Sequence, residues 1–419
     1  MTFVEFFDSA TVENVCASLA YVPDRVVYVG DNSKRMKKYA LYYQRVFENR
    51  GYNIGFSCKT VSKSNLDSAV KVITDIVETY DDCVFDITGG EEVLNVALGI
   101  VYARYPEKNI QIHKVNVRNN VFYDCDKDGI PVYRQTPFLS VKENLWIHGA
   151  DMVCGSVEED DTYNWDMNAD FAEDINKIWS VCKEDVRYWN AVISVFEAVE
   201  KTGMDDNENS LTTTSDIGTL DALISKRKVD FSKSNPVIRK LLEYGLLADF
   251  DIFNGKTVRI TYKNLQVKRC LTKSGQALEM KIFSCAQNAI DDNGEKVYND
   301  AVNGVVIDWD GDVGDETEGR YDTENEIDVL LMHGMIPVFV SCKNGIVSAE
   351  ELYKLNTVAK RFGGEYAKKV LVATSLSALG DAGEYLRQRA KDMNIRIVEN
   401  IQNLDDDELE RVLGNLWRN

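Results

Sequence analysis

The sequence has few of the residues that build metal-bound or disulfide-linked scaffolds. Its 419 residues include three histidines, and its nine cysteines form no C-x-x-C pair. Because zinc sites are built from closely spaced cysteines and histidines, this scarcity argues against one. We expect the cysteines to be reduced thiols, which is their usual state in a reducing cytosol.

Long apolar runs and an excess of basic charge are also lacking. No apolar run reaches the length of about 20 residues that a membrane span requires, and acids stand near the N-terminus where a secretory signal would carry bases. The formal net charge of −20 excludes a protein that coats nucleic acid with bases throughout, but it allows a local basic groove. We therefore expect a soluble, cytoplasmic protein that does not bind membranes.

The apolar content, by contrast, is ample. Hydrophobic residues make up 44% of the chain, and its length predicts two or three domains. In residues 1–137, short β-rich runs alternate with stretches that have apolar residues at helical spacing. The β-rich runs are residues 25–29, 52–56, 83–87 and 110–112. This alternation is typical of βαβ units, so we predict a Rossmann-like domain with a parallel sheet covered on both faces.

Two further regions follow. Residues 138–265 contain helical patterns at 171–200 and 236–247 and a strand-like alternation at 257–262. We expect a mainly helical connector that couples its flanking domains, and a winged helix is the alternative. Residues 266–419 combine an opening helix, a series of strands and crossover helices, which predicts an α/β domain of nuclease size.

The most distinctive feature of the first domain is the sequence DITGGEE at residues 86–92, where a strand runs into a helix. Gly89 and Gly90 lack Cβ atoms, so the backbone can approach a ligand closely, and the N–H groups that open the next helix attract phosphate. Thr88 adds a hydroxyl at the carboxyl end of the strand, where open α/β sheets bind ligands. A phosphate-binding loop is one interpretation, and a tight connection without a ligand is the other.

A second loop, at residues 30–33, is expected at the same edge of the sheet. Asn32 and Ser33 offer hydrogen-bond donors there, whereas Asp31 would repel a phosphate unless it binds a ribose hydroxyl. Glu91 raises the same question, although an acid in the first turn of a helix also stabilises the helix dipole. The G-x-G-x-x-G fingerprint of dinucleotide-binding enzymes is absent, which argues against an NAD enzyme.

In these loops the first domain resembles the CRISPR-associated Rossmann-fold (CARF) sensor domains, whose hallmark is a strand ending in Asn/Asp-x-Thr-Gly-Gly. Residues 88–90 match this motif directly, and residues 32 and 33 match by position only. The resemblance implies that two such domains pair about a two-fold axis and hold a cyclic oligoadenylate between them. The candidate ligand-binding residues all belong to the two loops: Asp31, Asn32, Ser33, Thr88, Gly89, Gly90 and Glu91.

The last domain carries acids and a lysine on two consecutive predicted strands. Glu326 and Asp328 stand two apart, so strand alternation places both on one face, and Ser341 and Lys343 share a face of the next strand. Hydrolysis of a phosphodiester uses such a set, because carboxylates hold Mg²⁺ or Mn²⁺ and a lysine stabilises the developing charge. The alternative is a solvated edge strand, on which such side chains are common.

The arrangement resembles the PD-(D/E)xK nuclease fold, in which a helix with a glutamate precedes a hairpin that carries the metal ligands and the lysine. The resemblance implies that Asp328 is the central metal ligand, Lys343 the catalytic lysine and Glu279 the acid of the helix. Glu326 is an extra candidate ligand, and either Glu279 or Glu326 is expected to complete the coordination of the metal. Ser341 departs from the family, which usually has an acid there, and this departure puts the affinity for the metal in question.

The order of the domains fits one assembly, the CARF and PD-(D/E)xK ancillary nucleases of type III CRISPR systems. That resemblance implies a homodimer that binds cyclic tetra-adenylate, or less often cyclic hexa-adenylate, and then cuts single-stranded DNA or RNA. Nicking of duplex DNA stays open. Two rival hypotheses are a ligand-responsive transcription regulator with an inactive nuclease-like domain and a constitutive restriction or repair endonuclease. The bases that form a candidate substrate track, or else a solvated surface, are Lys360, Arg361, Lys368, Lys369, Arg387, Arg389 and Lys391.

Overall fold

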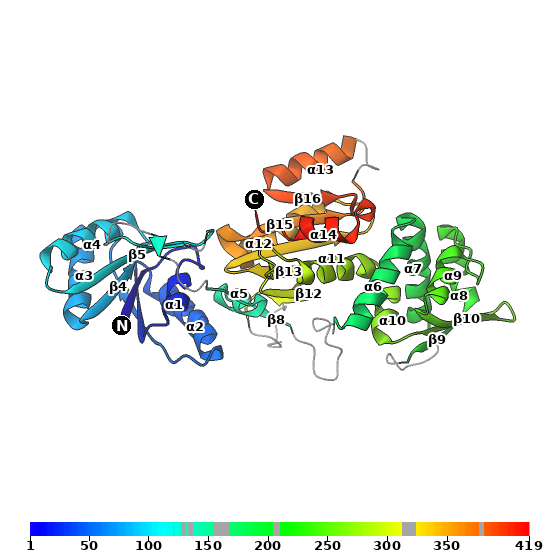
Figure 1. The fold of residues 1–419 in the computed structure, drawn as a ribbon, viewed down its shortest axis with the longest axis horizontal. Helices are drawn as coiled ribbons and strands as arrows, with labels where there is room; N and C mark the ends of the chain where they lie inside the picture. The colour runs from blue at the N-terminus through cyan, green and yellow to red at the C-terminus, as the bar shows by residue number, and fades with distance from the viewer. Residues whose placement is uncertain are drawn as a thin grey trace.

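The computed structural model describes residues 1–119, 121–126, 131–132, 137–153, 167–203, 210–311, 324–376 and 381–418. Figure 1 shows three bodies in a row: the N-terminal sheet domain, a central sheet domain built mainly from the C-terminal part of the chain, and a mainly helical lobe at the far end. None of the described helices is long and apolar enough to cross a membrane.

The N-terminal domain is a sheet covered by helices on both faces. Its elements are β1 (Thr2–Phe6), α1 (Cys16–Tyr21), β2 (Arg25–Gly30), α2 (Ser33–Asn49), β3 (Gly55–Thr60), α3 (Leu66–Thr79), β4 (Asp82–Asp86), α4 (Glu92–Arg104), β5 (Asn109–Asn116), β6 (Val121–Asp124) and β7 (Pro131–Val132). The described strands follow the order β3-β2-β1-β4-β5-β6-β7, of which β1 to β5 are parallel. Helices α1 and α2 pack on one face and α3 and α4 on the other. The predicted Rossmann-like arrangement is confirmed, with an antiparallel extension at β6 and β7.

Two features of this domain differ from the sequence prediction. Strand β1 is absent from that prediction because the acidic Glu5 interrupts its short apolar run, yet β1 lies between β2 and β4 at the centre of the sheet. Residues 7–9, which follow β1, therefore lie between the two predicted ligand loops. The strand expected at 52–56 is β3, which begins later, at Gly55.

The central domain contains a mixed sheet. Its elements are α5 (Val141–Ile147), β8 (Asp151–Met152), α11 (Gln276–Asn288), β12 (Asp300–Asp308), β13 (Glu324–His333), β14 (Ile336–Lys343), α12 (Ala349–Gly363), η1 (Gly364–Tyr366), β15 (Lys368–Ala373), α13 (Asp381–Asp392), β16 (Ile395–Glu399), η3 (Ile401–Asn403) and α14 (Asp406–Leu413). Its described strands follow the order β16-β15-β14-β13-β12-β8. Strand β13 is antiparallel to β12 and β14, whereas β14, β15 and β16 run parallel. The β13–β14 hairpin confirms the two consecutive strands predicted to carry the acids and the lysine.

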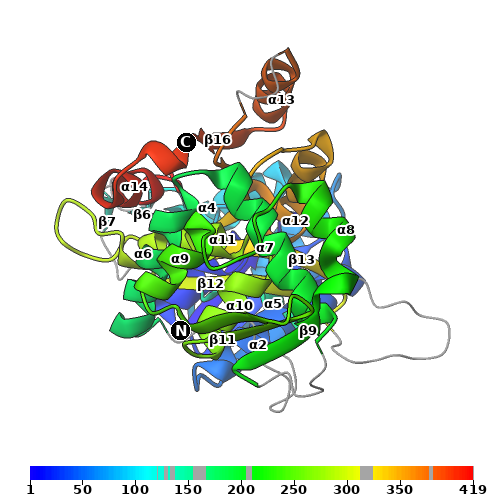
Figure 2. The same ribbon diagram turned by 90° about the vertical axis from the view of Figure 1, so that its right-hand side faces the viewer.

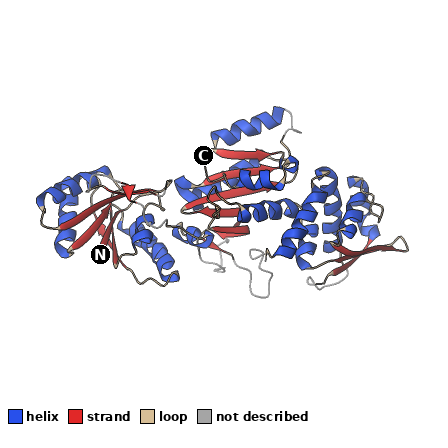
Figure 3. Cartoon of the chain, viewed as in Figure 1, coloured by secondary structure: helices blue, strands red, loops and turns tan. Residues whose placement is uncertain are grey.

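The lobe has the topology of a winged helix. Its elements are α6 (Ala169–Cys182), α7 (Val186–Lys201), β9 (Thr212–Asp216), α8 (Ile217–Arg227), α9 (Pro236–Glu243), β10 (Leu247–Phe253), β11 (Thr257–Tyr262) and α10 (Leu265–Thr272). The succession α7, β9, α8, α9, β10 and β11, with the antiparallel strand order β10-β11-β9, is the alternative that the sequence left open. Figure 2 views the molecule from this end, and Figure 3 shows how the helices dominate the lobe.

The lobe does not lie where a connector would. We expected residues 138–265 to couple the domains on either side, but the lobe lies on the far side of the central sheet from the N-terminal domain (Figure 1). The first part of the segment does make the junction, because β8 pairs with β12 and α5 contacts both α2 and α12.

Two apolar clusters hold the three bodies together. One joins the lobe to the face of the central sheet that α11 covers, and it includes Phe196 and Val340. The other joins the N-terminal domain, through Trp146 of α5, to the opposite face, where it includes Phe339. Burial of apolar surface stabilises by about 25 cal/mol per Å², so both clusters hold the central sheet firmly against its neighbours. The domain boundaries at residues 137 and 265 stay predictions, because the three bodies share these cores.

Candidate functional site

The carboxylate of Asp328 lies at the centre of a compact polar cluster on β13 and β14. Its Oδ2 accepts hydrogen bonds from the Cys342 backbone N–H (2.6 Å) and the Ser341 hydroxyl (3.2 Å). The Lys343 ammonium lies 3.8 Å from the same oxygen. The antiparallel register of the hairpin explains this convergence, because it places residue 328 opposite residue 341. The structure therefore brings together the predicted aspartate, serine and lysine.

Lys343 is held between two acids. Its ammonium lies 3.1 Å from Glu351 in the first turn of α12, a residue that the sequence prediction missed although its helix follows the lysine strand. Burial acts to lower the pKa of Lys343, but the charges of Asp328 and Glu351 outweigh it and raise that pKa. Burial raises the pKa of Asp328, and Lys343 opposes the shift. The lysine therefore stays charged at neutral pH.

The other two predicted acids lie at the margin of this cluster. Glu326 lines the same small pocket as Asp328 and Lys343, and the Lys273 ammonium lies 3.1 Å from its carboxylate. Glu279 enters from α11. Burial and the charge of Asp328 raise the pKa of Glu279 to about 8, and its Oε2 has no hydrogen-bond partner in the described part of the chain. Glu279 thus lies within reach of the charge of Asp328, but it is not among the residues that line the pocket.

The donor set fits a single hard cation that keeps part of its water. The pocket beside Glu326, Asp328 and Ser341 has a volume of about 20 Å³, which is room for one ion or water. Within the described ranges, no group of three or more carboxylate, thiol or imidazole side chains is placed to hold a metal. Mg²⁺ is commonly bound by one or two carboxylates and several waters. Asp328 and Glu326 are the pocket carboxylates that would hold such an ion.

The threonine of the Thr-Gly-Gly loop is fixed from inside its own domain. The Thr88 hydroxyl donates to Asp86 and accepts from the Val115 backbone N–H (2.7 Å). Asp86 is buried beside Glu5, whose Oε1 accepts from the Ser18 hydroxyl (2.7 Å). Burial raises the pKa of both acids, that of Asp86 to about 7. A buried acid pair therefore sets the position of Thr88.

The two glycines serve a close approach of the chain that follows β1. A Cβ at Gly90, where φ is +91°, would lie 2.4 Å from the Cβ of Phe6, and a Cβ at Gly89 would lie 2.8 Å from the Cβ of Asp8. Asp8 Oδ2 also accepts a hydrogen bond from the Gly90 N–H (3.1 Å). One donor that we predicted for a phosphate is therefore taken by a carboxylate of the chain itself, which the sequence missed together with β1.

Two of the remaining predicted ligand residues, Asp31 and Glu91, pair with Lys63. Its ammonium lies 3.3 Å from Asp31 and 2.8 Å from Glu91, so both acids of the two loops are paired with one lysine that the sequence prediction did not single out. The Asn32 side chain accepts a backbone N–H and caps α2, which begins at Ser33. The structure thus brings both loops to one edge of the sheet, as predicted.

A cavity of about 650 Å³ opens beside Thr88. Its lining includes Lys114 and Arg118 from the N-terminal domain and Tyr366 from η1 of the central domain. The Tyr366 hydroxyl donates to Glu13, which lines the same cavity and lies next to the glycine loop. A hydrogen bond thus joins the loop edge of the N-terminal sheet to the central domain.

Comparisons with known proteins place this geometry in a known fold. No protein-family model and no curated protein matches the sequence. Among solved structures, Can2 from Sulfobacillus thermosulfidooxidans, determined in complex with cyclic tetra-adenylate, aligns over 100% of this chain and 99% of its own, with a TM-score of 0.67 and 14% identity. Protein VC1899 from Vibrio cholerae aligns over 100% and 97%, with a TM-score of 0.70 and 17% identity. The chain has the fold of these two proteins. The likeness covers all three bodies.

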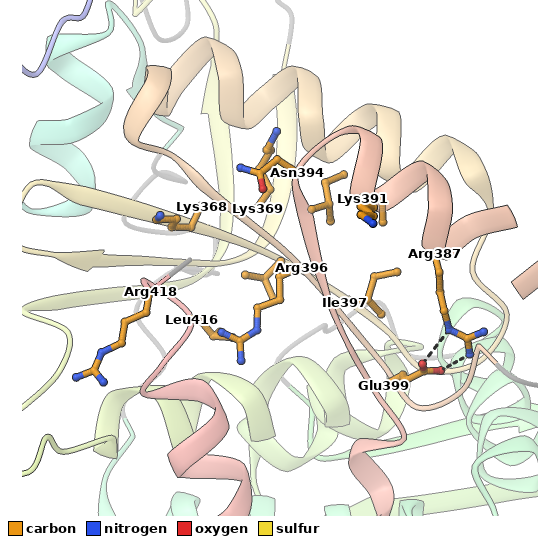
Figure 4. A pocket seen from close by; sticks show the side chains of 13 residues that line it. Lys368, Lys369, Arg387, Lys391, Asn394, Arg396, Ile397, Glu399, Leu416 and Arg418 are labelled. Atoms are coloured by element: carbon orange, nitrogen blue, oxygen red, sulfur yellow. Dashed lines mark hydrogen bonds and ion pairs between the residues drawn. The ribbon is translucent and has the colours of Figure 1, made fainter. Parts of the chain in front are cut away.

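A basic groove of about 470 Å³ follows β16, the outer strand of the Can2-like central sheet (Figure 4). Six bases and one acid line it, and that acid, Glu399, is paired with Arg387. Positive charge is therefore concentrated here although the chain as a whole is acidic. The predicted track residues that line the groove are Lys368, Lys369, Arg387 and Lys391. Two others have structural partners, since Arg361 donates to the His148 carbonyl and Arg389 to the Tyr385 hydroxyl.

Proposed function

We propose that the chain is a metal-dependent endonuclease activated by a cyclic oligoadenylate, most simply cyclic tetra-adenylate, and that it works as a homodimer in type III CRISPR defence. The observation that carries the proposal is the convergence of Asp328, Ser341 and Lys343 on one hairpin, beside the unpartnered carboxylate of Glu279. The fold shared with Can2, a protein determined with cyclic tetra-adenylate, supports the activator. The substrate is single-stranded DNA or RNA.

Each side chain of the cluster has a distinct part in phosphodiester hydrolysis. A Mg²⁺ or Mn²⁺ ion held by Asp328 and Glu326 would polarise the phosphate and acidify a water. Ser341 and the backbone N–H of residue 342 fix the carboxylate of Asp328. Lys343, oriented by Glu351, presents its ammonium to the negative charge that develops on the phosphate. The basic groove along β16 binds the sugar-phosphate backbone.

We propose that activation passes through the contact between Tyr366 and Glu13. Tyr366 belongs to the central domain, yet it lines the same cavity as Thr88 and donates to Glu13 beside the glycine loop. An anionic ligand in that cavity would contact Lys114 and Arg118, and it would repel the Glu13 carboxylate that lines the same cavity. If the ligand binds more tightly to the active arrangement, it shifts the population toward that arrangement.

The direct test combines activator, metal and substrate in one assay. The purified chain is incubated with each cyclic oligoadenylate and Mn²⁺, and labelled single-stranded DNA and RNA are followed together. We expect cleavage that needs both ligand and metal and that is lost in Asp328→Asn but kept in Glu243→Gln, a matched change of an exposed acid in the lobe. Intact nucleic acid with every ligand contradicts the proposal. Cleavage that ignores the ligand indicates a constitutive endonuclease instead.

The winged-helix topology of the lobe favours one second candidate, a ligand-responsive transcription regulator. Winged-helix domains belong to the helix-turn-helix class, which reads duplex DNA by placing a helix in the major groove. This candidate predicts ligand-dependent binding of a duplex without cleavage. Gel-shift measurements on duplex DNA, with Mn²⁺ present and strand integrity checked afterwards, separate the two candidates.

A further inference from the structure

A cavity of about 700 Å³ lies where the lobe meets the catalytic edge of the central sheet. Its walls come from the start of α7, the loop after β14, the end of β15 and η3. The loop after β14 begins at Asn344, immediately after Lys343, and the Thr374 N–H donates to the Lys343 carbonyl (3.2 Å). The cavity is therefore built on the residues that hold the proposed catalytic lysine.

The wall of this cavity contains polar atoms that the protein leaves unpaired. The side-chain oxygens Asn344 Oδ1, Thr374 Oγ1 and Gln402 Oε1 are buried and have no hydrogen-bond partner among the described residues. Buried polar groups are almost always hydrogen-bonded, since an unpaired one costs about 1–3 kcal/mol. All three residues line the cavity, so a polar ligand there would satisfy these oxygens once the side chains turn toward it.

The amide of Asn344 also ties the two walls together. Its Nδ2 donates to Asn190 Oδ1 of α7 (3.0 Å), and the Asn190 amide in turn donates to the Asn344 carbonyl. This reciprocal pair fixes the lobe against the loop that follows Lys343. The wall that α7 contributes is therefore held at a fixed position relative to Lys343.

The rim of the cavity favours an anion. Lys183, Arg187 and Arg227 line it. Its two acids are engaged elsewhere, because Glu184 pairs with Lys240 and Asp185 caps α7 by accepting a backbone N–H (3.0 Å). The rim thus offers positive charge toward a ligand, and the wall offers hydrogen bonds.

We infer that this cavity binds one nucleotide of the substrate strand, next to the phosphate that is cut. Rim bases such as Arg187 hold a backbone phosphate, and the side chains of Asn344, Thr374 and Gln402 turn toward the edge of the base and pair with it. A volume of about 700 Å³ lies in the ordinary range of small-molecule sites. A base edge is accessible to such contacts only when it is unstacked, so the occupant is a nucleotide of a single strand or a flipped one. This inference rests on the proposed nuclease function and adds a base preference to it.

Two kinds of variant separate the roles of rim and wall. Phosphate contacts bind all sequences alike, whereas base contacts carry the sequence preference. Arg187→Gln with Arg227→Gln should therefore raise the KM for single-stranded substrate about tenfold, with the cleavage profile unchanged. Thr374→Val keeps the shape of the side chain and should change the preferred base at one position beside the cut about threefold to tenfold, while Thr374→Ser should restore it. The matched control is Arg239→Gln, an exposed arginine elsewhere in the lobe.

The readouts are the KM and kcat on labelled strands and the sequenced ends of a randomised pool, with cyclic tetra-adenylate and Mn²⁺ present. A rim variant with the KM of the control, or a Thr374→Val profile equal to that of the parent, overturns the inference even when the parent chain cuts. Binding of a fluorescent single strand without metal is measured in parallel. If the parent binds but does not cut and the rim variants bind more weakly, the cavity still binds a strand, and it is the nuclease proposal that fails.

Discussion

Each of the two candidate sites contains a pair of neighbouring acids, and the two pairs differ in their surroundings. In the N-terminal domain, Glu5 and Asp86 are 2% and 1% exposed, and the main outside charge that acts on Asp86 is that of another acid, Glu13. In the central domain, Glu279 and Asp328 interact with the charges of Lys273 and Lys343, and Asp328 lines a pocket.

The two pairs differ in whether lysines lie near them and whether a pocket reaches them; the acids themselves are of the same kind. A sealed pair without a nearby cation lowers its cost of burial by holding a proton, and here that pair fixes Thr88 by a hydrogen bond. A pair that faces lysines and a pocket can exchange protons for a metal or meet a phosphate. Two neighbouring acids in a sequence therefore do not distinguish a structural pair from a reactive one.

The largest effect is expected at Asp328. Asp328→Asn keeps the shape of the side chain but removes its charge, so the initial rate of cleavage should fall by about three orders of magnitude or more. Thermal unfolding supplies a second readout, because Mn²⁺ should raise the Tm of the parent chain and leave that of the variant unchanged. A variant within tenfold of the parent rate would show that the central pair is as structural as the pair in the N-terminal domain.

A smaller effect is expected at the contact between the two ends. Tyr366→Phe keeps the ring but removes the hydroxyl that donates to Glu13, so the ratio of rates with and without activator should fall about tenfold. Tyr353→Phe, which changes an exposed tyrosine of α12, is the matched control. Equal activation ratios for the two variants would mean that the signal takes another route.

The smallest effect is expected in the pH dependence of stability. The folded pKa values of Glu5 and Asp86 are raised above the value of about 4 for an unfolded carboxyl. The folded state therefore binds more protons than the unfolded state, and stability falls as the pH rises from about 4 through about 7. Glu5→Gln should flatten this fall and raise the Tm at pH 8 by about 2–4 °C.

The control for this prediction is Glu107→Gln, which changes an exposed acid of the same domain. Melting curves of the parent and both variants are compared between pH 4 and pH 8. A Glu5→Gln curve parallel to that of the parent would mean that the buried pair does not hold an extra proton.

The β13–β14 hairpin and its polar face could be predicted from the sequence because strand alternation is a local property. A period of two is enough to place Glu326 with Asp328 and Ser341 with Lys343. The partner Glu351 could not be predicted, because it reaches Lys343 through the packing of a helix on the sheet. The cavity behind Lys343 depends on the position of the lobe, which no local pattern contains.

The loop edge of the N-terminal sheet was harder to predict for a different reason. The glycine loop was found by its motif, but the segment that packs on it follows β1, whose apolar pattern Glu5 breaks. Glu5 accepts a hydrogen bond from Ser18 and lies beside Asp86, and neither neighbour is visible in the strand itself. In the lobe, β9 has the sequence TTTSD without an apolar alternation, so the winged-helix sheet stayed incomplete in the prediction.

The two apolar clusters that bind the central sheet to its neighbours have a consequence for how this protein can be divided. A fragment cut at residue 137 or 265 would expose one face of a core that the intact chain keeps dry, and such exposed surface promotes aggregation. The N-terminal domain, the central domain and the lobe are therefore expected to unfold in one transition. They are also expected to be exchangeable between homologous chains only when all three are moved together.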